Sequence, residues 1–211
     1  QRFLIGSDKK FAGRDTLYET HGKVLVKDTT YYKAAGKIPA DYSVWWGFED
    51  EKLYALAREE LTDLAARPEP FNLMLLTVDT HHVGGYVCAL CDDEFDTQYK
   101  NVLACASRQA ATFVKWIQSQ PWYANTTIVL VGDHLYMDGT FVPLTADRRT
   151  YNVYINSVAK PSNARFRQFS TLDTFPTILD SMGVGYTGPG LGLGRSLFRD
   201  TETLLEKYGP D

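Results

Sequence analysis

The chain has 211 residues, of which 44% are hydrophobic and 23% are charged, and this composition is ordinary for a globular protein with a sizeable core. The net charge of -4 at pH 7, with no run of basic residues, argues against a nucleic-acid partner. The apolar runs reach about eight residues, well short of the ~20 that cross a bilayer, so no membrane-spanning segment is predicted.

The first residues look like a strand that is already under way. Arg2-Phe3-Leu4-Ile5-Gly6 is a short apolar run, and no signal-peptide pattern stands at Gln1. We therefore expect the chain to be a piece of a longer parent protein. In that case the lack of a membrane-spanning segment in these residues says nothing about the parent.

An amphipathic helix and a buried strand are predicted next. From Glu49 to Ala66, leucines and alanines recur on one helical face, and Arg67-Pro68-Glu69-Pro70 ends the helix. The run Phe71–Val78 is almost entirely apolar, which is typical of a strand that is buried on both faces.

A second helix and strand follow a loop that contains Gly84-Gly85. The helix is predicted from about Tyr99 to Gln118, with Val102, Leu103 and other apolar side chains turned inward. The run Thr126–Val131 is predicted to be a strand. A strand, a helix and a strand in this order indicate a parallel sheet with a right-handed crossover.

The last part of the chain predicts a short strand at Tyr151–Ile155 and a helix at Thr171–Met182, with Gly183 as its C-cap. Together these elements predict an α/β fold. We expect a mostly parallel sheet with helices on both faces, incomplete at its N-terminal side, with residues 1–211 as the C-terminal portion of a single domain.

The three cysteines are compatible with two kinds of site. Cys88 and Cys91 have CxxC spacing, but no second such pair exists to complete a zinc ribbon. A redox or metal site is one interpretation. The interpretation we favour is one structural disulfide to Cys105, with Cys91 as the expected partner and a spare thiol left over, in an oxidising compartment.

Histidines and aspartates follow two of the predicted strands. Asp133 and His134 come after Thr126–Val131, and Asp79, His81 and His82 come after Phe71–Val78. Ligands of open α/β sheets bind outside the carboxyl ends of the strands, and Asp and His are common ligands for divalent metals. An isolated Asp-His pair is more often a capped strand end, but the second histidine cluster favours a site.

The two adjacent histidines are predicted to point in different directions along an extended backbone. We expect His81 to face the site and His82 to support it. Asp79 is predicted to orient a histidine or bind substrate hydroxyls, with capping of the turn as the structural alternative.

Arg14 and Trp46 are further candidates near the start of the chain. A guanidinium group binds phosphate through two parallel hydrogen bonds, and Arg14 is placed in the first predicted loop. The side chain of Trp46 could form a wall for a substrate, although aromatic residues before a helix are more often part of the core. His21 is interpreted as structural, at the end of a helix.

In combination, these residues resemble a known family, the sulfatase-like branch of the alkaline phosphatase superfamily. Within it, the chain is similar to lipoteichoic acid synthases and membrane-anchored phosphoglycerol transferases. The motifs that carry the resemblance span nearly the whole chain: Phe11-Ala12-Gly13-Arg14 with Tyr18 and His21-Gly22, Trp46-Gly47 with Asp50, Leu76 to His82, Gly132-Asp133-His134, Thr171-Leu172-Asp173 with Pro176 to Asp180 and Gly183, and Gly194-Arg195-Ser196-Leu197.

The resemblance implies a metal-dependent phosphoryl transfer. A phosphoglycerol group would pass from a phospholipid-derived donor to a glycan or polymer acceptor through a phosphothreonine intermediate, with Mn2+ or Mg2+ as cofactor. By position, Asp133 and His134 would bind the metal, and Arg14 and His81 would be catalytic. The residues that contact the substrate would be Arg14, His81, Asp79 and Trp46. The parent protein would be membrane-anchored, at the extracytoplasmic face of a bacterial membrane.

The family's threonine nucleophile and acidic metal ligand have no counterpart in this chain. We therefore expect the chain alone to be inactive and to bind manganese weakly. Two alternatives remain at this stage: a sulfatase or phosphodiesterase of the same superfamily, and a non-catalytic module that binds glycans or lipid headgroups.

Overall fold

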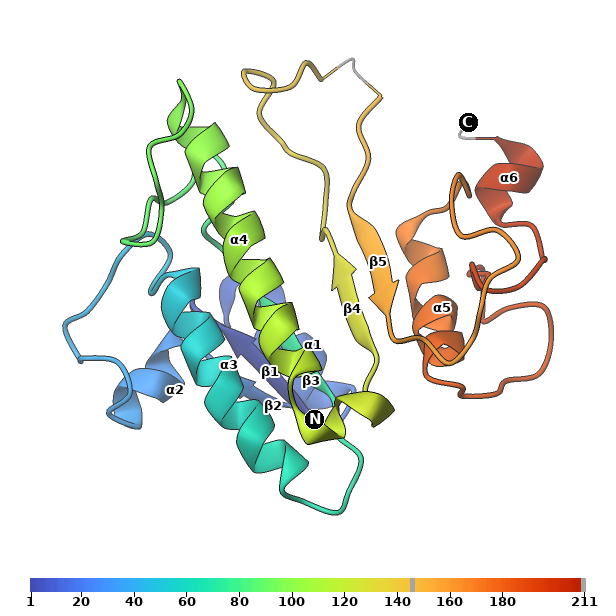
Figure 1. The fold of residues 1–211 in the computed structure, drawn as a ribbon, viewed down its shortest axis with the longest axis horizontal. Coiled ribbons are helices and arrows are strands. Elements are labelled where there is room, and N and C mark those ends of the chain that lie inside the picture. The colour runs from blue at the N-terminus through green and yellow to red at the C-terminus, as the bar shows by residue number, and fades with distance from the viewer. Residues whose placement is uncertain (145–146, 210–211) are drawn as a thin grey trace. The chain divides into compact units, whose positions relative to one another are not determined.

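The computed structural model describes residues 1–144 and 147–209, which form two compact units (Figure 1). Unit 1 comprises Gln1–Ile117 and Tyr136–Ala146, and unit 2 comprises Gln118–Leu135 and Asp147–Asp211. Each unit has its own β-sheet. No helix in the described parts of the chain combines the length and the apolar character needed to cross a membrane.

The sheet of unit 1 has three parallel strands in the order β2-β1-β3. These strands are β1 (Arg2–Ile5), β2 (Leu25–Lys27) and β3 (Leu73–Leu76). In the register of β1 and β3, Ile5 is paired with Leu76, so the carboxyl ends of these two strands lie side by side. The segments that follow them therefore begin at the same edge of the sheet.

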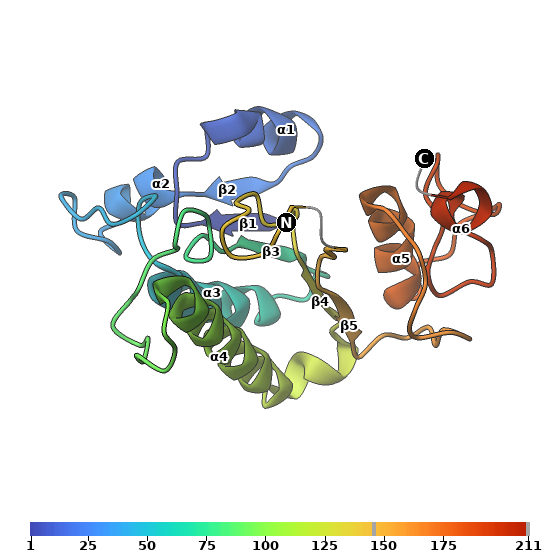
Figure 2. The same ribbon diagram turned by 90° about the horizontal axis from the view of Figure 1, so that it is seen from above.

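Side chains of β1 alternate between two layers of helices. Phe3 and Ile5 belong to one apolar cluster, and the ring of Phe3 lies 4.6 Å from that of Tyr18 in α1 (Arg14–Thr20). Arg2, on the other face, forms ion pairs with Glu60 and Asp63 of α3 (Asp50–Ala65). Figure 2 shows α1 on one side of this sheet and α3 on the other, which confirms the predicted arrangement for unit 1.

Two long helices of unit 1 confirm the helices predicted from periodicity. In α3, the buried side chains include Leu53, Leu56, Leu61 and Leu64, which form the predicted apolar stripe. The other long helix is α4 (Gln98–Gln118). The shorter elements are a 3-10 turn, η1 (Phe11–Gly13), and α2 (Thr29–Ala34). Asp28 begins α2 by accepting a 2.9 Å hydrogen bond from the Tyr31 amide.

Unit 2 contains a two-stranded antiparallel sheet of β4 (Ile128–Val131) and β5 (Asn152–Ile155). The remaining elements are η2 (Pro121–Asn125), η3 (Thr171–Asp173), α5 (Thr174–Ser181) and α6 (Leu204–Tyr208). The strand–helix–strand run was predicted to belong to a parallel sheet. This holds for β3, which is parallel to β1, whereas β4 pairs antiparallel with β5.

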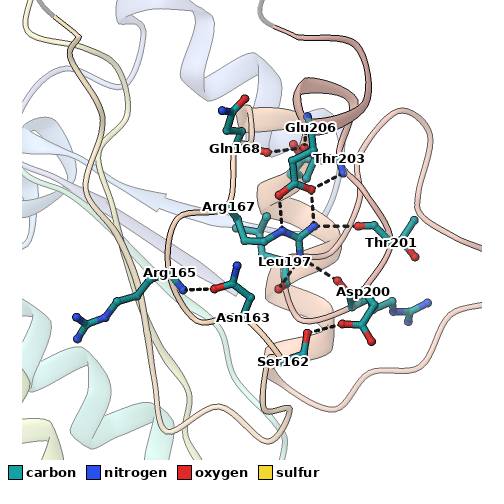
Figure 3. Close-up of polar contacts among 12 residues, drawn as sticks. Ser162, Asn163, Arg165, Arg167, Gln168, Leu197, Asp200, Thr201, Thr203 and Glu206 are labelled. Carbon is teal, nitrogen blue, oxygen red and sulfur yellow. Dashed lines mark hydrogen bonds and ion pairs between the residues drawn. The ribbon is translucent and has the colours of Figure 1, made fainter.

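Arg167 connects two separate segments in the C-terminal part of unit 2 (Figure 3). Its Nε and Nη2 atoms donate to the two carboxylate oxygens of Glu206, at 2.6 and 2.7 Å. It also donates to the backbone carbonyls of Arg199 and Thr201, each at 2.9 Å. Glu206 in turn accepts from the Thr203 amide and completes the capping box that begins α6.

Candidate functional site

Two glycines allow the backbone to pack closely at the carboxyl end of β1. A Cβ atom on Gly6 would lie 2.3 Å from the carbonyl oxygen of Phe48, and one on Gly47 would lie 2.1 Å from that of Gly6. The Phe48 amide donates to the Gly6 carbonyl at 2.9 Å. No larger residue fits at either position, so the turn that carries Trp46 is fixed against the end of β1.

Four aromatic rings connect Arg14 with the histidines that follow β3. The ring of Phe11 lies 5.0 Å from that of Trp46, the Trp46 ring lies 4.6 Å from that of His81, and the His81 ring lies 4.7 Å from that of His82. The Arg14 guanidinium carbon lies 5.0 Å from the Phe11 ring centre. We call these four rings the aromatic run; it brings together three predicted site residues, Arg14, Trp46 and His81.

Arg14 lies at the start of a helix and not in a loop as predicted. It is the first residue of α1, after a turn in which Ala12 and Gly13 both have positive φ angles. Its Nη1 donates to the Ser7 hydroxyl at 3.3 Å, and the side chain is partly buried. A guanidinium group that is held at a sheet edge by a hydroxyl and an aromatic ring is oriented to bind an oxyanion.

His81 is held by the turn that follows β3. Its amide donates to the Val78 carbonyl at 3.0 Å, and its Nδ1 lies 2.6 Å from the His82 carbonyl oxygen. Because a carbonyl only accepts, Nδ1 carries the hydrogen, and Nε2 has the lone pair when the ring is neutral. The prediction that the two histidines diverge was wrong, since the chain turns here and the rings stack.

Asp79 is buried and paired with the first residue of α3. Only 2% of Asp79 and 1% of Asp50 is exposed. The Asp50 amide donates to Asp79 Oδ2 at 3.2 Å, while the amides of Val78 and Asp79 donate to the Asp50 carboxylate at 2.8 and 3.1 Å. This arrangement favours the capping alternative for Asp79, because the carboxylate joins the His81 turn to the start of α3.

The Asp50–Asp79 pair makes the stability of unit 1 depend on pH. Burial raises the pKa of both carboxyl groups, and repulsion from Asp50 raises that of Asp79 further. The folded-state pKa values lie above the unfolded value of about 3.9. The pair's stabilising contribution is therefore complete below about pH 4 and is lost as pH rises through the folded-state values.

We expect Asp79→Asn to flatten this pH dependence. The asparagine keeps an oxygen for the Asp50 amide but cannot ionise, so the variant should lose less stability than the wild type between about pH 4 and pH 8. Thermal melting across this range measures the effect. Asp41→Asn, which changes an exposed carboxylate, is the control and should follow the wild type. Parallel curves for wild type and Asp79→Asn would contradict the assignment.

Asp133 and His134 follow β4 in unit 2, at the strand end predicted from the sequence. Asp133 Oδ2 lies 3.5 Å from His134 Nε2, and both side chains are exposed. Two donor atoms bound at roughly 2.1 Å to neighbouring positions of one ion lie roughly 3.0–3.4 Å apart, which is close to this spacing. His134 Nδ1 lies 2.7 Å from the Leu135 carbonyl oxygen, so Nε2 carries the lone pair that a metal needs.

The pair fits part of a metal site. Among the described residues of unit 2, no third histidine, cysteine, aspartate or glutamate lies close enough to complete a site with them. An octahedral ion such as Mn2+ or Mg2+ needs several more oxygen or nitrogen ligands. Asp133 and His134 would therefore supply two positions of the coordination shell.

The cysteines form one disulfide and one free thiol. Cys91 is bonded to Cys105 in α4, and Cys88 is buried and unpaired. The bond ties the loop after the His81 turn to the long helix of unit 1.

Comparison with known protein families identifies the chain. The family model described as Sulfatase matches residues 6–184. The chain belongs to the sulfatase family. This assignment agrees with the motifs that carry the resemblance in the sequence, and the matched region includes Arg14, Trp46, His81, Asp133 and His134.

Curated relatives in the sulfatase family are phosphoglycerol transferases. The chain is 31% identical over 202 residues to phosphoglycerol transferase I of Escherichia fergusonii, and it has the same identity over the same length to that of Escherichia coli. Each alignment covers 92% of this chain and 26% of the relative. The chain thus spans about a quarter of the length of these proteins.

Solved structures confirm the fold expected of a sulfatase-family member. A protein of the alkaline phosphatase superfamily from Vibrio parahaemolyticus matches with a TM-score of 0.65 and 18% identity, over 87% of this chain and 44% of that one. The lipoteichoic acid synthase LtaP from Listeria monocytogenes matches with a TM-score of 0.51 and 20% identity, over 67% of this chain and 35% of that one.

Three residues without a predicted role support the candidate site. Ser7 and Phe11 contact the Arg14 guanidinium, and Asp50 holds the turn that carries His81. Phe11 and Asp50 lie in the same motifs as Arg14 and Trp46, and this shared position was the available signal. Nothing in the sequence pattern marks Ser7 beyond its place directly after β1.

The partial coordination shell predicts weak metal binding by this chain of the sulfatase family. We expect calorimetric titration with Mn2+ to give a dissociation constant weaker than about 1 µM, because two ligands cannot offset dehydration of the ion. Asp133→Ala should remove the remaining heat of binding. A micromolar or tighter site in the wild type would contradict the prediction.

Proposed function

We propose that residues 1–211 are the C-terminal portion of a single sulfatase-like catalytic domain. In the longer parent protein, this domain would transfer a phosphoglycerol group from a phospholipid-derived donor to a glycan or polymer acceptor. The observation that carries the proposal is the aromatic run, which joins a guanidinium group to an imidazole at the adjacent ends of β1 and β3. The named activity of the relatives supports the choice of group.

Different residues of unit 1 would bind the phosphoryl group and transfer the proton. Arg14 would bind two oxygens of the phosphoryl group, held in place by Ser7 and Phe11. His81, with Nδ1 bonded to a backbone carbonyl, would present Nε2 to the oxygen that leaves phosphorus. Trp46 would form the wall between them.

The reaction would proceed in two displacements. A threonine hydroxyl outside this chain would lose its proton to solvent and form a bond to phosphorus while the bond from phosphorus to the donor's leaving oxygen breaks, and protonated His81 would give that oxygen its proton. An acceptor hydroxyl would then give its proton to His81 and form a bond to phosphorus, while the bond to the threonine oxygen breaks and that oxygen regains a proton from solvent. Asp133 and His134 would hold an Mn2+ or Mg2+ ion, which supplies Lewis-acid stabilisation of charge on the phosphoryl oxygens.

The parent protein would be membrane-anchored, with this domain at the extracytoplasmic face of a bacterial membrane. This location follows from the proposed donor, because a phospholipid headgroup is available only at a membrane surface. The Cys91–Cys105 disulfide is compatible with an oxidising compartment.

Arg14→Lys in the parent protein tests the function. We expect phosphoglycerol transfer to fall by about 10²-fold, because lysine keeps the charge but cannot make two parallel hydrogen bonds to phosphate. The measurement is transfer of labelled glycerol phosphate from phosphatidylglycerol vesicles. Arg67→Lys, at the exposed end of α3, is the matched control and should have full activity. Equal activity of both variants would contradict the role of Arg14.

A sulfatase or phosphodiesterase of the same superfamily is the second candidate, favoured by the description of the matching family. An aryl sulfate and a phosphodiester are the discriminating substrates. Hydrolysis of either by the parent protein, without transfer of glycerol phosphate, would select this candidate. Binding of glycans or lipid headgroups with no turnover of any of these substrates would instead indicate a non-catalytic module.

A further inference from the structure

Three sulfur atoms gather in unit 1, beside the start of α4. The Sγ atoms of Cys88, Cys91 and Cys105 all lie within 4.8 Å of one another. Cys88 Sγ is 3.6 Å from Cys91 Sγ and 4.0 Å from Cys105 Sγ. A single structural disulfide needs only two of these cysteines, so the position of the third requires a separate explanation.

The spacing of Cys88 from the other two sulfurs is that of thiolates around one metal ion. Four sulfurs placed at 2.3 Å from Zn2+ in a tetrahedron are roughly 3.8 Å apart. The two distances from Cys88 lie on either side of this value. Cys88 and Cys105 are buried, and Cys91 is partly exposed, so the cluster has one open side.

Gln109 provides a second, independent observation at the same place. Its Nε2 lies 3.5 Å from the sulfurs of Cys88 and Cys105. Its Oε1 is buried and has no hydrogen-bond partner among the described atoms. A half-turn of the amide would exchange the two atoms and direct a carbonyl oxygen to the sulfurs. A buried acceptor without a donor is costly, and a cation between the sulfurs would satisfy it.

The open side of the cluster faces an acidic loop. A cavity of about 290 Å³ is lined by Cys91 and by acidic residues that follow it, among them Asp92, Asp93 and Asp96. Arg108 and Lys100 pair with part of this charge. With Glu94, the loop has four carboxylates against these two cations, so it remains negative and would attract a cation to Cys91.

We propose that Cys88, Cys91 and Cys105 form a redox-dependent site for a soft divalent cation of the zinc class. A dithiol reductant would give two electrons and two protons to the Cys91–Cys105 bond and become a disulfide itself. The three thiols would then release their protons as their sulfurs bind the ion, with Gln109 or water in the fourth position. While the disulfide is intact, one thiol remains and the site does not form.

The protonation state of Cys88 agrees with this order of events. Burial raises the pKa of its thiol, so it stays protonated beside the disulfide. A metal ion provides the positive charge that a buried thiolate needs.

The test uses the full 211-residue chain with Co2+ and Zn2+ as probes. The chain is reduced with a phosphine, separated from it under nitrogen, and titrated with Co2+. We expect the visible bands of tetrahedral cobalt and a sulfur-to-cobalt charge-transfer band, both removed by one equivalent of Zn2+. The oxidised chain should show neither.

Cys88→Ser separates the metal site from the disulfide. This variant keeps Cys91 and Cys105, so its oxidised form should have the far-UV circular dichroism of the wild type. After reduction it should bind Zn2+ more than about 100-fold more weakly, since the loss of a direct ligand exceeds the effect of a supporting residue. His21→Gln, which removes an exposed histidine outside the cluster, should bind like the wild type.

Three results would overturn the proposal. The first is a reduced wild type that folds but gives no cobalt bands. The second is a reduced wild type that is unfolded and does not regain its circular dichroism with Zn2+. The third is a Cys88→Ser variant that binds Zn2+ as tightly as the wild type.

Discussion

Replacement of Arg167 by alanine is expected to lower the free energy of unfolding of unit 2 by about 3–5 kcal/mol. The wild-type side chain is largely buried and donates to Glu206 and to backbone carbonyls from a segment far along the chain. Without it, the Glu206 carboxylate would lose the guanidinium donors and keep the Thr203 amide, and these carbonyls would lose a donor where the chain is mostly buried (Figure 3). Urea unfolding followed by circular dichroism measures the change.

Arg165→Ala is the matched control for this experiment. Arg165 lies two residues away, is exposed, and points its side chain away from the cluster in Figure 3. Its loss should change the unfolding free energy by less than about 0.5 kcal/mol. Equal unfolding midpoints for the two variants would show that Arg167 does not hold the C-terminal segment.

Acid titration gives a second measurement on the same variant. The hydrogen bonds from Arg167 lower the pKa of Glu206 to about 2. Because this value is depressed, the contribution is present above the ordinary carboxyl pKa of about 4.3 and is lost as pH falls through the folded-state value. The stability difference between wild type and Arg167→Ala should therefore shrink between about pH 4 and pH 2. A difference that is constant over this range would argue that Glu206 is not its source.

The sequence predicted the parts of the site that depend on local pattern. Short apolar runs located β1 and β3, and the position just after β3 marked His81, which the structure places beside Trp46. Such positions can be read locally, because strands of a parallel sheet are rich in apolar residues and polar groups gather at their carboxyl ends.

The sequence predictions that were wrong concern features that depend on contacts between distant residues. Periodicity placed Leu103 inside α4, but it is 36% exposed, because Asn101 and Cys105 occupy the buried positions. Asn101 is held there by bonds to Asp93 and to the Phe95 backbone. A polar residue that is buried by such bonds cannot be recognised from hydropathy alone.

The pairing of strands and the contacts of Asp79 also depend on residues that are distant in the sequence. An apolar run indicates a strand but not its partner, so β4 could be predicted while its antiparallel pairing with β5 could not. Asp79 was placed at the site because it follows a strand. Its carboxylate accepts a hydrogen bond from the amide of the distant Asp50, a partner that the sequence pattern does not indicate. The geometry of the aromatic run likewise required Trp46 and His81, 35 positions apart, to meet.

Asp133→Ala in the parent protein is expected to reduce phosphoglycerol transfer on the order of 10³-fold. The Lewis-acid stabilisation that a metal supplies is worth several kcal/mol, and each tenfold change in rate corresponds to about 1.4 kcal/mol of activation free energy. The reason is geometric. With Oδ2 of Asp133 absent, His134 Nε2 is a single ligand and the ion loses half of what this chain supplies. Bound manganese, measured after gel filtration, should fall with the activity, and high Mn2+ should restore part of both.

Asp147→Ala, which breaks an exposed ion pair with Arg149 in the same unit, is the control and should leave both transfer and bound manganese unchanged. If transfer by Asp133→Ala stayed at the wild-type rate, Asp133 could not be a metal ligand; if activity fell while bound manganese did not, its role would lie in the structure of the loop after β4.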